Sequence, residues 1–222
     1  MRLFSDSIGR KVVMAITGLL MVLFVVGHLL GNLSIFAGPD GINAYAEKLH
    51  QLAPVVWTTR IVMGVAVLLH LVLSIQITLE NSAAKPEKYQ VSRNLRATFA
   101  SKNMIWTGVI LGAFIVYHLL HFTFRVTPSL VLQTDTLSRF DVYTMVVTSL
   151  QKAGIAAIYI VAMVSLFLHL SHGVQSTFQT LGLSNAKLLP NYGVAGKVLS
   201  GIFLVGYGAI PVLIFVGFLA AN

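Results

Sequence analysis

Residues 12–36 read VVMAITGLLMVLFVVGHLLGNLSIF, an apolar stretch without a charged side chain. A helix of about 20 mostly apolar residues spans the hydrocarbon core of a bilayer. The stretch is too long for the apolar core of a cleavable signal peptide, which has roughly 7–15 residues. We therefore expect it to be retained as a first transmembrane helix.

Turn and charge signals separate this stretch from further apolar stretches. Gly38-Pro39-Asp40-Gly41 ends the first, and a polar segment from Glu80 to Lys102 follows the second. Thr127-Pro128 ends the third, and Pro190-Asn191 precedes the last. The sequence thus predicts an all-α membrane protein, one transmembrane domain over residues 1–222 that forms a five-helix bundle, with spans at about 12–36, 56–79, 104–126, 153–177 and 195–220.

The apolar segment 141–152 is too short to be a further span and ends in Gln151-Lys152. We expect it to form an interfacial helix before the fourth span. The sequence shows no second, soluble domain and no clear internal repeat.

The composition agrees with a membrane protein. Of the 222 residues, 56% are hydrophobic and only 10% are charged, against roughly a quarter charged in soluble domains. The chain has no cysteine, which excludes disulfides, covalently attached haem, thiolate-held iron–sulfur clusters and zinc fingers in this chain. The net charge of +8 indicates loop charges that set topology rather than a nucleic-acid partner.

Basic residues predict the orientation of the bundle. An N-terminus in the cytoplasm gives ten Lys and Arg on the inside and five on the outside, as the positive-inside rule favours. The C-terminus is then outside, and the polar segment between the second and third spans is the docking face for a cytoplasmic partner. The inside residues are Arg2, Arg10, Lys11, Lys85, Lys88, Arg93, Arg96, Lys102, Lys187 and Lys197; the outside residues are Lys48, Arg60, Arg125, Arg139 and Lys152.

Histidine is the unusual residue of the predicted spans, which contain no Asp or Glu. An ionisable side chain inside a membrane indicates a functional site, whereas a single histidine is often only hydrogen-bonded to a neighbouring helix. The absence of carboxylates disfavours a proton-coupled transporter. Six of the seven histidines lie in spans, and only His50 is expected to be solvated: His28, His50, His70, His118, His121, His169 and His172.

Depth in the membrane sorts four of these histidines into two layers. At about 1.5 Å of helix rise per residue, His28 and His118 each lie roughly 12 Å from the outer end of their span. His70 lies at roughly 21 Å and His169 at roughly 24 Å. We name His28 and His118 the outer pair, and His70 and His169 the inner pair. Two imidazoles at equal depth on two helices are what bis-histidine ligation of haem iron requires.

Two further histidines leave the ligand choice open at this point. His121 and His172 each follow a chosen histidine by three residues and so share its helix face. Either is an alternate ligand, or a polar side chain bonded to a haem propionate or a neighbouring helix. Gly27, Gly31 and Gly173 flank several of the histidines and are small enough to admit a flat macrocycle.

The ordered set of motifs resembles the di-haem cytochrome b membrane anchor of succinate:quinone oxidoreductases, the succinate dehydrogenase and quinol:fumarate reductase complexes. The similar type is the single five-helix anchor, and the resemblance covers about residues 5–220. It is carried by Ser7-Ile8-Gly9-Arg10-Lys11, Thr17-Gly18, Gly27-His28-Leu29, Leu69-His70-Leu71, Tyr117-His118-Leu119, His169-Leu170-Ser171-His172-Gly173 and Gln179-Thr180-Leu181-Gly182.

The resemblance implies ligands and function. Haem ligands fall on His118 and His169, and the pairing is first span with third and second with fourth. A cytoplasmic flavoprotein with FAD would interconvert succinate and fumarate, and an iron–sulfur subunit would pass electrons to the inner haem b. The outer haem b would exchange them with a quinone, usually menaquinone. This implies a multi-pass subunit of the bacterial cytoplasmic (inner) membrane with no succinate or fumarate site of its own; a dimer of the complex is left open.

The quinone and proton sites are less defined by sequence. In the segment Ile42–Leu52, the side chains of Ile42, Tyr45, Leu49 and Leu52 share one helical face. Glu47 is the acid–base candidate for the quinone, the alternative being a solvated Glu47-Lys48 pair. Some related fumarate reductases carry a glutamate two residues before the fourth-span ligand, where this chain has Phe167. That proton path is therefore not expected here. Arg10, Lys11 and Arg93 are candidate partners for inner haem propionates.

Other functions fit part of the pattern. A di-haem anchor of a hydrogenase, formate dehydrogenase or nitrate reductase would share buried histidines and a basic inner face, although the Thr-Gly-x9-His pattern from Thr17 to His28 favours the succinate family. A haem-free transporter would use the histidines to line a path and would be colourless. A structural anchor with degenerate haem sites is disfavoured because all four ligands are present.

Overall fold

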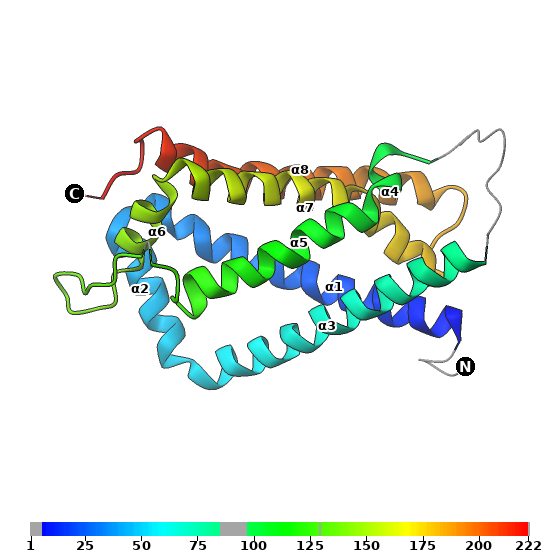
Figure 1. Ribbon diagram of the computed structural model, residues 1–222, viewed down its shortest axis with the longest axis horizontal. Coiled ribbons are helices and arrows are strands. Elements are labelled where there is room, and N and C mark those ends of the chain that lie inside the picture. Colours follow the sequence, from blue (N-terminus) through cyan, green and yellow to red (C-terminus); the bar gives the residue numbers. More distant parts are fainter. Residues whose placement is uncertain (1–5, 85–96, 129, 222) are drawn as a thin grey trace.

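The computed structural model describes residues 6–84, 97–128 and 130–221, and within them the chain is helical with no strand. Among these residues, five helices are long and apolar enough to cross a membrane. Figure 1 shows them as an elongated bundle. The predicted all-α, five-span architecture is therefore confirmed in its helices, and the predicted direction of insertion stays a prediction.

The spanning helices are α1 (Ser7–Asn32), α3 (Ala53–Ala83), α5 (Met104–His118), α7 (Ala153–Thr180) and α8 (Leu188–Phe215). A 3-10 segment, η1 (Leu33–Ala37), extends α1, and a π-helical turn, η2 (Leu119–Thr123), extends α5. Three shorter helices complete the fold: α2 (Gly38–Gln51), α4 (Phe99–Lys102) and α6 (Val142–Leu150).

Four spans agree with the sequence prediction within a few residues, and the fifth is displaced. Helix α8 begins at Leu188 rather than near 195 and ends at Phe215 rather than near 220. Pro190 lies in its first turn, where a missing N–H costs nothing because that group has no partner within the helix. Gly217, with φ of 82°, ends the helix, and Phe218 N–H bonds to the Leu213 carbonyl in a Schellman motif.

Contacts between the helices define which of them are neighbours in the bundle. Helices α7 and α8 run side by side along most of their length, α1 packs on α3 and α7, and α5 packs on α7. Helices α2 and α6 contact each other at one end of the bundle, and α4 lies at the other (Figure 1). The first and last described residues lie at opposite ends, as an odd number of spans requires.

The two tryptophans of the chain mark the ends of the apolar band. Trp57 lies in the first turns of α3 and Trp106 at the start of α5, and their exposed fractions are 59% and 67%. Tryptophan is enriched at membrane interfaces. Between these ends, large aliphatic side chains of α3 such as Leu68 are exposed, which a lipid environment satisfies.

Helix α6 confirms the helix expected within 141–152, but much of it is buried. Asp141 caps it by accepting a hydrogen bond from the Thr144 N–H at 3.0 Å. Tyr143, Val147 and Leu150 pack into the core at this end of the bundle. This short helix closes the end of the bundle where α1 and α5 terminate.

Candidate functional site

The four histidines sorted by depth meet as two pairs. The ring centroids of His28 on α1 and His118 on α5 are 5.9 Å apart, with an interplanar angle of 86°. Those of His70 on α3 and His169 on α7 are 6.4 Å apart, at 63°. Both pairings predicted from depth are therefore present in the structure, and all four rings are half-buried between helices.

These separations suit two imidazoles that bind one metal from opposite sides. A metal–imidazole nitrogen bond is about 2 Å, so a linear arrangement places the ring centroids roughly 6 Å apart. Among the described residues no group of three or more His, Asp or Glu side chains converges where it could hold a bare metal ion. Each pair brings two imidazoles together, a donor set that would fit a haem, whose macrocycle supplies the other four ligands.

The inner pair is held by hydrogen bonds from neighbouring helices. Nδ1 of His70 lies 3.0 Å from the Met14 carbonyl oxygen and 3.4 Å from Thr17 Oγ1, both on α1. Nδ1 of His169 lies 3.1 Å from Thr107 Oγ1 on α5. In both rings the bonded nitrogen is Nδ1, which leaves Nε2 for a metal.

The outer pair has aromatic surroundings instead. The His28 ring stacks on Phe24 with centroids 5.4 Å apart and lies 6.1 Å from the ring of Tyr207. The Tyr207 hydroxyl donates a 2.8 Å hydrogen bond to the Val25 carbonyl. The ring of His118 lies among Phe114, Phe122 and Tyr159. These side chains surround the pair with aromatic rings, and the Tyr159 hydroxyl lies 3.3 Å from Nδ1 of His118.

His121, the alternate to His118, is buried and fully hydrogen-bonded. Its exposed fraction is 0%. Nδ1 lies 3.0 Å from the Tyr159 hydroxyl and Nε2 lies 3.1 Å from Ser149 Oγ. The π-helical turn η2 begins directly after His118 and turns His121 toward α6 and α7. Both ring nitrogens of His121 are thus committed to protein partners.

The remaining histidines occupy other positions. His172 lies on α7 one turn after His169 and is half-buried. His50 is exposed on α2, with Nδ1 3.0 Å from the Ala46 carbonyl oxygen, in agreement with a histidine outside the spans. Phe167, where some relatives of the resembled family have a glutamate, is half-buried on α7.

Helix α2 carries the candidate Glu47. Its carboxylate is exposed, and no hydrogen bond or ion pair to it is present among the described residues. Of the apolar face predicted for this segment, Ile42 is buried, whereas Tyr45 and Leu49 are exposed. The structure brings α2 against the end of α1, where the Tyr45 ring lies so close to Gly31 that an added Cβ would collide with it.

The glycines named in the sequence differ in what they contact. A Cβ added at Gly27 or Gly173 would meet no atom within 4 Å. Gly18 and Gly108 were not singled out as contacts, yet they face the inner pair: an added Cβ would lie 3.3 Å from Cε1 of His70 and 3.4 Å from Cε1 of His169, respectively.

A polar network at the α2–α6 end was missed by sequence reasoning. Asn43 is fully buried and donates to Asp135 at 3.2 Å and to Asp141 at 3.1 Å. Burial alone would raise the pKa of Asp135, but hydrogen bonds from the side chain and backbone of Arg139 lower it to about 2. Burial also acts to raise the pKa of Asp141, but hydrogen bonds lower it, chiefly the bond from the Thr144 N–H. The network joins α2 to the start of α6 and to the segment that precedes α6.

The basic candidates for propionate binding are only partly described. Arg10 on α1 forms a two-pronged ion pair with Glu80 on α3, and its NH2–Oε2 distance is 2.8 Å. Its Nε is buried without a partner. Arg93, like Arg2, Lys85, Lys88 and Arg96 of the predicted inner face, lies outside the described residues.

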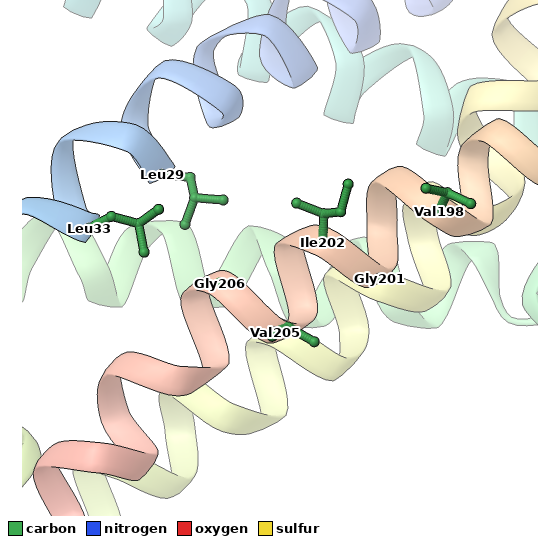
Figure 2. Close-up of a pocket in the computed structure, with 7 residues that line it drawn as sticks. All are labelled: Leu29, Leu33, Val198, Gly201, Ile202, Val205 and Gly206. Atoms are coloured by element: carbon green, nitrogen blue, oxygen red, sulfur yellow. The ribbon is translucent and has the colours of Figure 1, made fainter. Parts of the chain in front are cut away.

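Two apolar grooves lie on the bundle surface. Figure 2 shows one of them, lined by Leu29 of α1 and Leu33 of η1 and by residues of α8 that include Ile202, Val205 and Gly206. A second lies between α5 and α7. Apart from Tyr117 in the second groove, their lining is apolar, which suits lipid chains.

No protein-family model, curated protein or solved structure matches this chain. The membership in a family that the motifs predict therefore stays a prediction.

Proposed function

We propose that this chain is the membrane-anchor cytochrome b of a succinate dehydrogenase or fumarate reductase complex, which carries electrons through two b haems between an iron–sulfur subunit and a quinone, usually menaquinone. The outer pair would hold one haem and the inner pair the other. When bound, each haem supplies an iron that accepts and releases one electron. The proposed location is a bacterial cytoplasmic membrane.

The observation that carries the proposal is the meeting of four histidines from four helices as two pairs at two levels. Both ring separations, 5.9 and 6.4 Å, suit imidazoles on opposite sides of one iron. A histidine that only bridges two helices would need one polar partner and no second imidazole facing it. Two such pairs along one bundle favour electron transfer along the membrane normal over a single structural contact.

The chain's own residues prepare these positions. Nδ1 of each inner histidine is hydrogen-bonded to a neighbouring helix, which orients the ring and leaves Nε2 for iron. Aromatic side chains such as Phe24 and Phe114 exclude water from the outer pair. A dry, apolar site disfavours a bare metal ion, because its charge would lose the stabilisation that water gives. Such a site can accommodate an iron that is bound by neutral imidazoles.

The assignment to the succinate family depends on the sequence motifs rather than on the site. FAD, the iron–sulfur clusters and the dicarboxylate site belong to partner subunits in this proposal, and the basic end of the bundle would receive them. Glu47 stays the candidate acid–base group for the quinone, since it is exposed on α2 beside the end of α1 that carries His28.

A reduced-minus-oxidised spectrum and a pyridine haemochrome assay on the detergent-purified complex test the proposal, with its subunits identified by mass spectrometry. We expect two b haems per chain and co-purifying flavoprotein and iron–sulfur subunits. Two haems with hydrogenase, formate dehydrogenase or nitrate reductase subunits would move the chain to another respiratory complex. A colourless protein would refute the haem sites and favour histidines that line a transport path.

A further inference from the structure

The surroundings of the inner pair reveal a repeat within the chain. Met14, Thr17, Gly18 and His28 on α1 have counterparts in Met104, Thr107, Gly108 and His118, each 90 residues later on α5. The shared pattern is Met-x2-Thr-Gly-x9-His. It is too short and too interrupted to stand out among apolar helices, and it corrects the expectation that the chain has no internal repeat.

Helices α1 and α3 form one half of the repeat, and α5 and α7 form the other. In each half, the Met-x2-Thr-Gly segment of the first helix contacts a histidine on the second helix. The α1 copy contacts His70 of α3, through the Met14 carbonyl and Thr17 Oγ1. The α5 copy contacts His169 of α7, through Thr107 Oγ1 at 3.1 Å and a backbone hydrogen bond to Met104. The two halves therefore hold the inner pair with the same atoms at equivalent positions.

The hydrogen bonds decide which ring nitrogen carries the proton. A backbone carbonyl can only accept, so Nδ1 of His70 must donate to Met14. Each threonine hydroxyl directs its own proton into its helix: Thr17 donates to Val13 at 2.9 Å and Thr107 donates to Asn103 at 3.0 Å. The threonine oxygen is then an acceptor for the imidazole, and both neutral rings are protonated on Nδ1 with a free lone pair on Nε2.

The glycine of each copy fixes how closely the ring lies on the helix. A Cβ added at Gly18 would sit 3.3 Å from Cε1 of His70, which is tighter than most van der Waals contacts, and one added at Gly108 would sit 3.4 Å from Cε1 of His169, at the short end of ordinary contact. A side chain larger than a methyl group at either position would require the imidazole to shift. The outer pair lacks this arrangement, because Nδ1 of His118 faces the Tyr159 hydroxyl at 3.3 Å instead.

We propose that Met14-x2-Thr17-Gly18 and Met104-x2-Thr107-Gly108 are two matching clamps that fix the Nδ1-protonated tautomer and the orientation of His70 and His169. The hydrogen bonds alone are the basis for the orientation and the tautomer of His70 and His169. A second consequence rests on the proposed function: a hydrogen bond donated from Nδ1 makes an axial imidazole more basic and lowers the potential of its haem. The threonines are positioning residues that act through the histidines.

Threonine-to-valine variants of the purified complex test the clamps by redox titration of both haems. In Thr107→Val and Thr17→Val, we expect one midpoint potential to shift upward and the other to stay, with the same haem affected in both. Thr107→Val should give the larger shift, since its oxygen is closer to the imidazole. Thr107→Ser should restore the original potential. The matched control is Thr58→Val, which removes an exposed α3 hydroxyl bonded only to its own helix, to Pro54 at 2.9 Å.

Three outcomes would overturn the effect on the midpoint potential. They are unchanged potentials in both valine variants, a shift in the potential of the haem that His28→Ala removes, and a Thr107→Ser variant that does not restore the original potential. A readout that needs no haem separates this from failure of the proposed function. In 15N NMR of histidine-labelled protein prepared without haem, His70 and His169 should be protonated on Nδ1, each signal assigned by its loss in a His70→Gln or His169→Gln variant. Protonation on Nε2 in this haem-free protein would refute the clamps, whether or not the chain binds two haems when they are supplied.

Discussion

The hydroxyl of Tyr159 lies 3.0 Å from Nδ1 of His121 and 3.3 Å from Nδ1 of His118. His121 continues this chain of polar contacts to Ser149 Oγ on α6, at 3.1 Å. One tyrosine thus joins a ring of the outer pair to a second histidine that has no free nitrogen. The two histidines, three residues apart in the chain, therefore have different contacts: the ring of His118 faces His28, whereas both nitrogens of His121 are bonded.

Alanine at these two positions should therefore have opposite effects. His118→Ala removes a ring that faces His28 and should leave one haem per chain. His121→Ala should retain two haems while destabilising the fold, because Ser149 loses a partner in a fully buried position and an unsatisfied buried hydroxyl costs about 1–3 kcal/mol. Pyridine haemochrome content and thermal unfolding measure the two effects. Two haems in His118→Ala with loss in His121→Ala would reverse the assignment.

Replacing the tyrosine itself separates its hydroxyl from its ring. Tyr159→Phe keeps the aromatic packing against Phe114 but leaves Nδ1 of the buried His121 without a partner, at a cost of about 1–3 kcal/mol. We expect a lower melting temperature with both haems present. Tyr192→Phe is the control, because its hydroxyl bonds to the Leu183 carbonyl at an exposed site. Equal melting temperatures for the two variants would show that the bond to His121 contributes nothing to stability.

The sequence was sufficient for the number of spans, for the approximate bounds of four of them and for the pairing of the histidines. In a membrane protein, a long apolar stretch directly indicates a spanning helix. The rise per residue then gives the depth of His28 or His169 from its position in that helix. Glu47 and the orientation of the bundle rest on loop features that the described contacts neither support nor oppose.

Side-chain partners were beyond the sequence. The burial of His121 depends on η2, a π-helical turn that no propensity marks, and on Ser149, which lies on another helix. The bonds from Asn43 to Asp135 and Asp141 join positions nearly a hundred residues apart, so no local pattern signals them. The proposed clamps have a sequence signal, the repeat of Thr17-Gly18 at Thr107-Gly108, but it is too short to stand out among apolar helices.

The polar network at the α2–α6 end should loosen in acid. The pKa of Asp135 is about 2 in the folded chain, below its ordinary value of 3.8. A carboxylate whose pKa is lowered by folding stabilises the fold fully at any pH above its pKa in the unfolded chain. This contribution is lost as the pH falls through its pKa in the folded chain. Hydrogen-exchange protection of residues 133–143 should therefore decline between about pH 4 and pH 2, relative to unstructured peptide at each pH.

Asp135→Asn supplies the reciprocal test of the network. The amide cannot pair with Arg139 as a charge, so the variant should be less protected at neutral pH and should change less on acidification. Protection that falls equally in both proteins would mean that Asp135 is not the group that titrates.

The contact between Gly31 and Tyr45 ties α2 to the end of α1. Gly31→Ala should destabilise the fold by roughly 1–3 kcal/mol, since the new Cβ collides with the tyrosine ring and forces it aside. Gly64→Ala on α3 is the control, because its Cβ meets nothing within 4 Å, and it should be neutral or stabilising through lower backbone entropy. The decisive comparison is a thermal-unfolding cycle with Tyr45→Ala. Once the ring is removed, Gly31→Ala should no longer destabilise; an undiminished cost in that background would place the steric conflict elsewhere than between α1 and α2.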